Sequence, residues 1–156
     1  YTRLLKRDLL DSKLTEGIRL FISGSAPLLE ETFNEFNQRT NHQILERYGM
    51  TETNMNTSNP LKGNRKPGTV GLPLEDVQVR VVDEENNLLS QGEIGNIQIK
   101  GPNVFKGYWE MPEKTKEDFS KDGFFNTGDK GLIDEGGYVS IIGRSKDMII
   151  SGGLNV

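Results

Sequence analysis

The residues best suited to chemistry lie in the stretch Ile44–Thr53, which reads I-L-E-R-Y-G-M-T-E-T. It begins as a short apolar run typical of a buried strand, breaks at Gly49, and offers Tyr48, Thr51 and Glu52 close together. An aromatic ring can stack on a base, a hydroxyl can hydrogen bond to a phosphate, and a carboxylate can bind Mg²⁺. The types and spacing therefore fit a nucleotide site, although the stretch taken alone reads equally well as a loop with a polar tip.

A strand, a helix and a second strand should position this stretch. Alternating apolar residues over 18–22 predict the first strand, and the second is Gln43–Tyr48. The helix between them follows an interruption at 23–27, with Ser25 as its expected N-cap and Pro27 in its first turn. A unit of this length is a βαβ unit with parallel strands, so both strand ends lie at one sheet edge, where open α/β sheets bind their ligands.

The rest of the chain predicts a helix at the N-terminus and a β-rich unit in the second half. Residues 1–16 have leucines at helical spacing, and residues 54–73 have the composition of a basic loop. Apolar residues then alternate over 77–81 and 94–99, with Gly95 indicating a bulge or bend, and further short strands follow a helix at 112–119. The strands expected last are 124–126, 132–134 and 138–142, with the T-G-D loop after the first and a glycine turn at 136–137.

The predicted fold class is therefore α/β plus β: the end of a parallel α/β subdomain followed by an antiparallel, distorted β-barrel subdomain. We assign residues 1–60 to the C-terminal part of the α/β nucleotide-binding subdomain and residues 61–142 to the β-barrel-like subdomain. Residues 143–156 carry a charged run beside two glycines and are expected to be a hinge to a further domain.

Composition narrows the classes of partner. The net charge of −4 gives no reason to expect nucleic acid or an anionic membrane as a partner. No apolar run reaches the ~20 residues that span a bilayer, so no transmembrane segment is expected. The chain has no cysteine, which excludes disulfides and thiolate metal sites and is compatible with a reducing compartment, so the cytoplasm is the expected location.

Four stretches, in order along the chain, resemble the adenylate-forming (AMP-binding) superfamily of acyl-CoA synthetases, adenylation domains and luciferases. They are S-G-S-A-P-L at 23–28, Y-G-M-T-E at 48–52, T-G-D at 127–129 and G-R-S-K-D at 143–147. The longer stretches E-R-Y-G-M-T-E-T-N-M-N-T-S-N-P and G-P-N-V-F-K-G-Y-W are most similar to the malonyl-CoA synthetase branch. The family's glycine- and Ser/Thr-rich phosphate loop and its C-terminal domain do not occur in these residues, so we expect an internal fragment that ends at the hinge and lacks synthetase activity alone.

The resemblance implies an ATP-dependent ligase that joins a carboxylic acid to ATP as an acyl-adenylate and then passes the acyl group to coenzyme A. It implies ATP, Mg²⁺ and CoA as cofactors and co-substrates, and a small carboxylic acid as substrate. The implied catalytic residues are Thr51 at the phosphates, Glu52 as the Mg²⁺ ligand and Lys146 as the hinge residue. The implied nucleotide-binding residues are Ser25, Ala26, Pro27, Tyr48, Gly49, Met50, Thr51, Asp129 and Arg144, with Tyr48 against adenine and Asp129 at the ribose. Gly152 and Gly153 resemble the glycine loop along the pantetheine route, and Gly71 is a candidate for the acyl pocket.

Arg47 departs from the pattern of many relatives, which have a small residue before the Y-G pair. An arginine beside the acyl pocket could pair bidentately with a second carboxylate on the substrate, which would favour malonate or a related short dicarboxylate. The alternative is an ion pair with Glu46 or another nearby acid.

Two rival functions stay open at this point. The first is a ligase for another acid, such as a medium- or long-chain fatty acid, or an adenylation domain that loads a carrier protein. The second, from a different class, is a non-catalytic β-rich binding module in which the motifs are coincidental. Loss of Mg²⁺-dependent nucleotide binding in Glu52→Ala and Asp129→Ala would separate the enzyme classes from the module.

Overall fold

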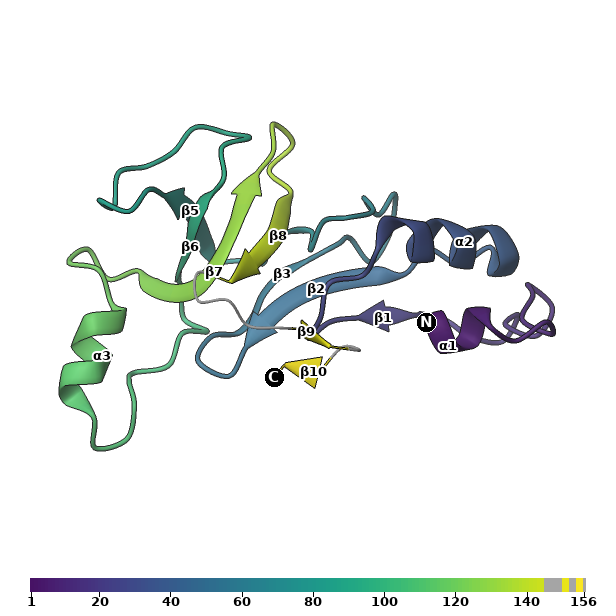
Figure 1. Cartoon of the computed structure of the whole chain (residues 1–156), viewed down its shortest axis with the longest axis horizontal. Coiled ribbons are helices and arrows are strands. Elements are labelled where there is room, and N and C mark those ends of the chain that lie inside the picture. The colour runs from purple at the N-terminus through teal and green to yellow at the C-terminus, as the bar shows by residue number, and fades with distance from the viewer. Residues whose placement is uncertain (145–149, 152–153, 156) are drawn as a thin grey trace.

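The computed structural model describes residues 1–144, 150–151 and 154–155 (Figure 1). The first half holds α1 (Thr2–Leu5), β1 (Ile22–Ser23), α2 (Glu30–Thr40), β2 (Leu45–Met50), β3 (Asn54–Ser58) and β4 (Leu72–Pro73). The second half holds β5 (Gln78–Val82), β6 (Gly95–Lys100), α3 (Pro112–Asp118), β7 (Phe125–Ile133) and β8 (Val139–Arg144). A short antiparallel pair, β9 (Ile150–Ser151) and β10 (Leu154–Asn155), follows.

The first half forms a four-stranded sheet in the order β1-β2-β3-β4. β1 and β2 are parallel, with Ile22 opposite Leu45, and α2 connects them, so the predicted βαβ unit is confirmed. Helix α2 buries Phe33 and Phe36 against Ile44 and Leu10. The helix ends at Thr40, and the next residue, Asn41, has a left-handed backbone conformation (φ 58°), which is a common C-terminal cap.

The helix predicted over 1–16 is wrong, because only Thr2–Leu5 is helical. Leu9 and Leu14 are 82% and 65% exposed, so the leucine face is not a buried face. The guanidinium of Arg39 instead donates hydrogen bonds to the carbonyl oxygens of Leu5, at 2.7 Å, and of Arg7 and Leu10. A side chain from α2 therefore satisfies carbonyl groups that a continuous helix would satisfy internally.

The expected loop over 54–73 also needs correction, because it contains β3 and β4. β3 pairs with β2 as an antiparallel hairpin, and four of its five residues are polar. Asn56 and Thr57 are fully buried, and Thr57 Oγ1 donates to the carbonyl oxygen of Val70 at 2.8 Å. A strand whose buried side chains are polar gives no apolar pattern in the sequence.

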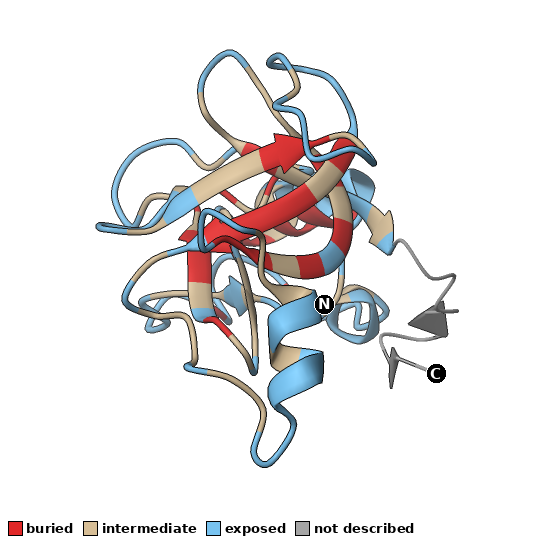
Figure 2. Cartoon of the chain, turned by 90° about the vertical axis from the view of Figure 1, so that its left-hand side faces the viewer, coloured by how far each residue is buried: buried red, intermediate tan, exposed pale blue. Residues whose placement is uncertain are grey.

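The second half is an antiparallel four-stranded sheet in the order β5-β6-β7-β8, which confirms the predicted succession of an α/β part and a β part. Its core contains Ile97, Ile99 and Val139, and Figure 2 shows the buried segments running along these strands. Helix α3 has no buried residue. The two sheets meet where Val70 N and Gly71 O hydrogen bond to the backbone of Val139, at 2.8 and 2.9 Å.

The T-G-D stretch does not form a loop between two short strands, as expected, but lies inside β7. The register of β6 against β7 shifts there, so that 127–129 lie opposite Ile97 alone. The irregularity predicted at Gly95 thus lies two residues further along β6, at Ile97, and the bulging residues belong to the partner strand. Among the described residues, no helix is long and apolar enough to cross a membrane.

Candidate functional site

Tyr48 lies inside β2 rather than at its end, because the strand continues through Gly49 to Met50. The pairing with β3 shifts between Tyr48 and Gly49. A Cβ at Gly49 would lie 2.0 Å from the carbonyl oxygen of Asn54, so the close approach of the hairpin strands requires glycine. The predicted break at Gly49 is therefore wrong, and a bulge takes its place and sets the direction of the tyrosine.

Three residues from three separate motifs form one cluster. Tyr48 donates its hydroxyl proton to Asp129 Oδ2, with 2.5 Å between the oxygens and 81 positions between the residues. Arg144 Nε lies 3.1 Å from the other carboxylate oxygen, Asp129 Oδ1. Asp129 is 5% exposed, so the charge of this carboxylate lies inside the protein and is balanced by the guanidinium.

The bulge in β7 places Asp129 toward β2. Thr127 Oγ1 donates to the carbonyl oxygen of Ile97 at 2.9 Å and accepts the backbone N–H of Asp129 at 3.1 Å. Gly128, between them, has a φ of 74°, a conformation that glycine adopts without strain. The Thr-Gly-Asp order thus has a local structural reason for each of its three residues.

Burial sets the protonation behaviour of the cluster. It raises the pKa of Asp129, and the hydrogen bond from Tyr48 and the charge of Arg144 oppose that rise. Burial also raises the pKa of Tyr48, and the neighbouring charge of Asp129 raises it further. The phenol therefore stays protonated and acts as a donor to the carboxylate.

Thr51 and Glu52 lie in the turn that joins β2 to β3. Residues 51–53 form this turn, which Thr53 N closes on the carbonyl oxygen of Met50 at 3.2 Å. Thr51 is exposed and Glu52 is half-buried. Glu52 Oε1 lies 3.3 Å from the hydroxyl of Tyr108, a residue of the G-P-N-V-F-K-G-Y-W stretch.

Ser25, Ala26 and Pro27 follow β1 but do not begin α2. The helix starts at Glu30 with Leu29 as its N-cap residue, so the expected capping role of Ser25 and the first-turn position of Pro27 are wrong. Ser25 is exposed in a turn with a φ of 68°. The turn follows β1, whose last residue Ser23 lies opposite Glu46, so β2 continues four residues beyond the end of β1 and the two strands do not end at the same level.

Arg47 and Glu46 point to opposite faces of β2, as neighbouring strand residues do. Arg47 is exposed, and its side chain passes Gly24, where an added Cβ would lie 3.6 Å from Arg47 Cγ. Among residues 1–144, Arg47 has no ion pair, whereas Glu46 is buried and accepts the backbone N–H groups of Leu28 and Gly68. The alternative of an Arg47–Glu46 ion pair is therefore wrong.

Four other predicted site residues lie either apart from the cluster or outside the described residues. Gly71 has a φ of 88°, and a Cβ there would lie 1.9 Å from the backbone of Ser58, so packing alone accounts for its glycine. Its contact with substrate stays a prediction. Lys146, Gly152 and Gly153 lie outside the described residues.

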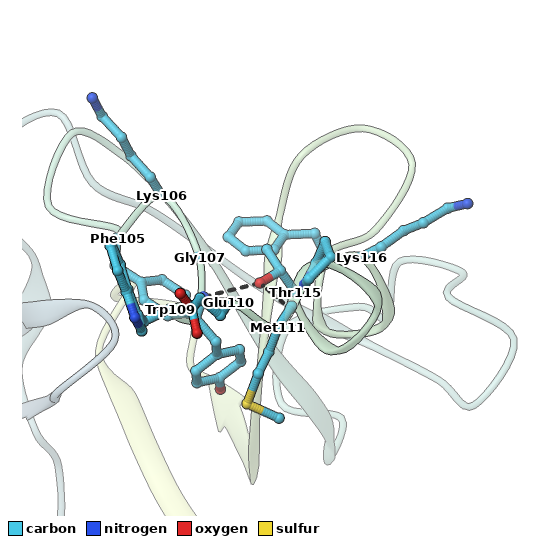
Figure 3. Close-up of a pocket in the computed structure, with 11 residues that line it drawn as sticks. Phe105, Lys106, Gly107, Trp109, Glu110, Met111, Thr115 and Lys116 are labelled. Carbon is cyan, nitrogen blue, oxygen red and sulfur yellow. Dashed lines mark hydrogen bonds between the residues drawn. The ribbon is translucent and has the colours of Figure 1, made fainter.

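Sequence reasoning missed two residues of this region, Glu46 and Tyr108. Burial and a lack of countercharge mark Glu46, and neither is visible in a sequence. Tyr108 could have been proposed as a site residue, because it lies in the family-like stretch G-P-N-V-F-K-G-Y-W. Its contact with Glu52 could not, because the two residues are 56 positions apart in the sequence. An open hollow of about 760 Å³ lies next to Tyr108, between 105–112 and α3 (Figure 3), and none of the predicted site residues lines it.

A magnesium ion fits the turn in a limited sense. Mg²⁺ binds through one or two carboxylates together with substrate phosphates and water, so it does not need a dedicated protein cage. Glu52 offers one carboxylate of which Oε1 has a hydrogen-bond partner, and the neighbouring Thr51 offers an exposed hydroxyl. The described residues contain no cluster of three His, Cys, Asp or Glu side chains that would form a complete protein-only site.

The chain matches the family model described as AMP-binding enzyme over residues 1–109. It is 43% identical to a malonate–CoA ligase of Arabidopsis thaliana over its whole length, which is 27% of that protein. It is 40% identical to the mitochondrial malonate–CoA ligase of Bos taurus, again over its whole length and over 30% of the relative. The chain thus spans less than a third of the length of these relatives.

The fold matches solved structures equally well. The crystal structure of ATP-bound MatB from Rhodopseudomonas palustris shares 61% sequence identity with a TM-score of 0.92, covering the whole of this chain and 31% of that one. The family match covers more than half of the chain and includes Tyr48, whereas Asp129 and Arg144, the other two residues of the cluster, lie beyond residue 109. The chain belongs to the AMP-binding enzyme family.

Proposed function

We propose that the chain is the part of an ATP-dependent acyl-CoA synthetase that holds the nucleotide and the acid. The observation that carries this proposal is the cluster of Tyr48, Asp129 and Arg144, because it unites three motifs of the family in one hydrogen-bonded group. The malonate–CoA ligases among the relatives support the class of reaction.

The proposed nucleotide contacts follow from this cluster. Each carboxylate oxygen of Asp129 has one contact, Oδ2 with Tyr48 and Oδ1 with Arg144, and retains a second lone pair, so the group can also accept hydrogen bonds from ribose hydroxyls. The Tyr48 ring would lie against adenine, and the turn containing Ser25, with Ala26 and Pro27, would approach the base through its backbone. Arg144, 38% exposed at its side chain, retains donors for the ribose or phosphate side.

In the proposed first reaction, a carboxylate oxygen of the acid attacks the α-phosphorus of ATP. A new oxygen–phosphorus bond forms, the bond to the β-phosphate oxygen breaks, and pyrophosphate leaves. In the second, the sulfur of coenzyme A attacks the acyl carbon, loses its proton, and displaces AMP. Both steps bring anions together, so the protein must supply position and positive charge.

Thr51 and Glu52 are the described residues proposed to serve the phosphates. The Thr51 hydroxyl would donate to a phosphate oxygen, and Glu52 would hold Mg²⁺, which when bound neutralises phosphate charge. Gly49 and Met50 position this turn at the end of the hairpin. Lys146 as hinge residue, with Gly152 and Gly153 along the thiol route, remains proposed from the resemblance alone.

Arg47 supports malonate or a related short dicarboxylate as the substrate. Its guanidinium is exposed, has no ion pair within residues 1–144, and lies beside Gly24, next to the proposed adenine turn. A planar guanidinium can bind the distal carboxylate of a diacid through two parallel hydrogen bonds. A monocarboxylate offers no partner for that charge.

Pyrophosphate release by the whole enzyme tests the proposal. The assay uses ATP, Mg²⁺ and a panel of malonate, methylmalonate, acetate and octanoate. Release is expected to be much faster with the dicarboxylates than with acetate or octanoate, and release with acetate or octanoate at equal rate would contradict the role of Arg47. Binding of ATP that is unchanged in Glu52→Ala and Asp129→Ala would contradict the nucleotide site itself.

The cytoplasm is the compartment that we propose, with the mitochondrion as the alternative raised by the name of the Bos taurus relative. Cell fractionation followed by immunodetection of the chain decides between the two. Recovery in the mitochondrial fraction would overturn the cytoplasmic assignment.

A further inference from the structure

We infer that Tyr108 is a positioning residue that orients the Glu52 carboxylate for its cation. The inference rests on the proposed function, in which Glu52 holds Mg²⁺. Tyr108 lies outside the four motifs, on the loop between β6 and α3. Its hydroxyl is 3.3 Å from Glu52 Oε1 and 3.1 Å from Asp118 Oδ2.

The hydroxyl is a donor at neutral pH. A tyrosine hydroxyl has an ordinary pKa of about 10, so it carries its proton at neutral pH. A phenol has one proton, so it can donate to only one of the two carboxylates at a time. Asp118 also receives Lys114 Nζ at 2.7 Å, whereas Glu52 has no other side-chain donor within residues 1–144. Glu52 is therefore the carboxylate that depends on Tyr108.

Hydrogen bonds from backbone N–H groups hold the loop that carries Tyr108 both to the turn that contains Glu52 and to helix α3. Phe105 N donates to the carbonyl oxygen of Glu52 at 2.8 Å, which ties the loop to the turn through the backbone. Tyr108 N donates to Thr115 Oγ1 at 2.9 Å, and Figure 3 shows Thr115 at the contact between the loop and α3. A Cβ at Gly107 would lie 2.6 Å from Thr115, so the approach of loop and helix is close.

The ring of Tyr108 is held as well as its backbone. It meets the ring of Phe105 edge to face, with 4.8 Å between the centroids, and Phe105 packs on Phe119 and Phe125. A hydroxyl on a fixed ring can fix the carboxylate that it contacts. With Oε1 of Glu52 engaged by Tyr108, Oε2 is the oxygen left for a cation. Groups of this kind, which hold a metal ligand in place, typically change metal affinity by 10–100-fold when removed.

The test measures metal binding rather than turnover. Mn²⁺ is titrated into the whole enzyme in the presence of α,β-methylene-ATP, which cannot release pyrophosphate, and bound Mn²⁺ is followed by electron paramagnetic resonance. Tyr108→Phe is expected to weaken Mn²⁺ binding by about 10-fold and to leave binding of the nucleotide without metal within about 2-fold. Tyr138→Phe is the matched control, because the Tyr138 hydroxyl has no carboxylate contact among the described residues.

Glu52→Ala and the double variant separate this inference from the proposed function. If Tyr108 acts through Glu52, then Tyr108→Phe has no further effect on Mn²⁺ binding in the Glu52→Ala background. An equal loss in both backgrounds, or a loss no larger than that of Tyr138→Phe, would overturn the positioning role alone. Unchanged Mn²⁺ binding in Glu52→Ala would instead overturn the metal assignment, and this inference with it.

Discussion

The buried carboxylate of Glu46 predicts that the stability of the fold decreases as pH rises toward neutrality. Glu46 is 6% exposed, and its Oε1 has no hydrogen-bond partner. Burial raises its pKa to about 7, from an ordinary value of 4.5, and the nearby charge of Glu30 adds to that rise. The backbone N–H groups of Gly68 and Leu28 oppose it without cancelling it.

The sign and size of the effect follow from the two pKa values. Below pH 4.5 the group is protonated in both folded and unfolded chains and has no effect. Between 4.5 and about 7 the unfolded chain loses the proton while the folded chain retains it, so rising pH favours unfolding. The pKa of Glu46 differs by about 2.5 between the folded and unfolded chains, which corresponds to a loss of about 3 kcal/mol in the free energy of unfolding. The loss is complete above pH 7.

Urea unfolding of the 156-residue chain at pH 5, 6, 7 and 8 measures this effect. Glu46→Gln cannot ionise, so the difference in unfolding free energy between variant and wild type should shift by about 2–3 kcal/mol in favour of the variant from pH 5 to pH 8. Glu75→Gln, at an exposed position, is the control and should follow the wild type. The raised pKa of Asp129 acts equally in wild type and variant, so it cancels in the comparison. Parallel curves for wild type and Glu46→Gln would refute the reasoning.

Three further outcomes are expected. Tyr48→Phe removes the hydroxyl that donates to Asp129 and should weaken ATP binding by about 10-fold, as the loss of a hydrogen bond to a charged group typically does. Calorimetry measures this affinity, and an unchanged affinity would contradict the cluster as a nucleotide site. Arg47→Gly should lower kcat/KM for malonate by about 10–100-fold and that for acetate by less than about 2-fold, and equal losses for both acids would demote Arg47 to a structural role. Gly71→Ala should lower the free energy of unfolding in urea by about 3 kcal/mol or more. Gly92→Ala, at a residue with a similar φ of 84° but open space around it, should lower it by only about 1 kcal/mol. Equal losses would show that backbone strain, and not contact with β3, sets the need for glycine.

Periodicity was sufficient for the βαβ unit because its buried residues are apolar. Phe33 and Phe36 in helix α2, with Ile44 just before strand β2 and Leu45 at its start, give a readable apolar pattern, and the parallel pairing followed from the length of the connection. The same reasoning failed for residues 1–16, where the leucine spacing fits a helix. Arg39, which lies 34 residues from Leu5 and 29 from Leu10 in the sequence, binds their carbonyl groups instead. Tertiary contacts overrode a local preference there.

The site was predictable in its parts and not in its geometry. Tyr48, Asp129 and Arg144 were each named from their motifs, but nothing in the sequence shows that a bulge in β7 turns Asp129 onto the tyrosine hydroxyl. Strand β3 was missed because its buried positions are polar, Asn56 and Thr57 among them. Hydrogen bonds between distant residues stabilise these positions, and such bonds leave no periodic trace.

The meeting of the two sheets at Gly71 has a consequence for building hybrid enzymes from relatives of this chain. The expected subdomain boundary at residues 60 and 61 looks suitable for recombination, because it falls in a polar connection. Yet Val70 and Gly71 lie beyond that boundary while they contact Thr57 and Ser58 before it, and they also pair with Val139. A crossover at 60/61 would place Val70 and Gly71 in a different parent from Thr57 and Ser58, whereas one in the exposed turn at 84–87 would keep these contacts within one parent and leave the backbone pairing with Val139 between parents.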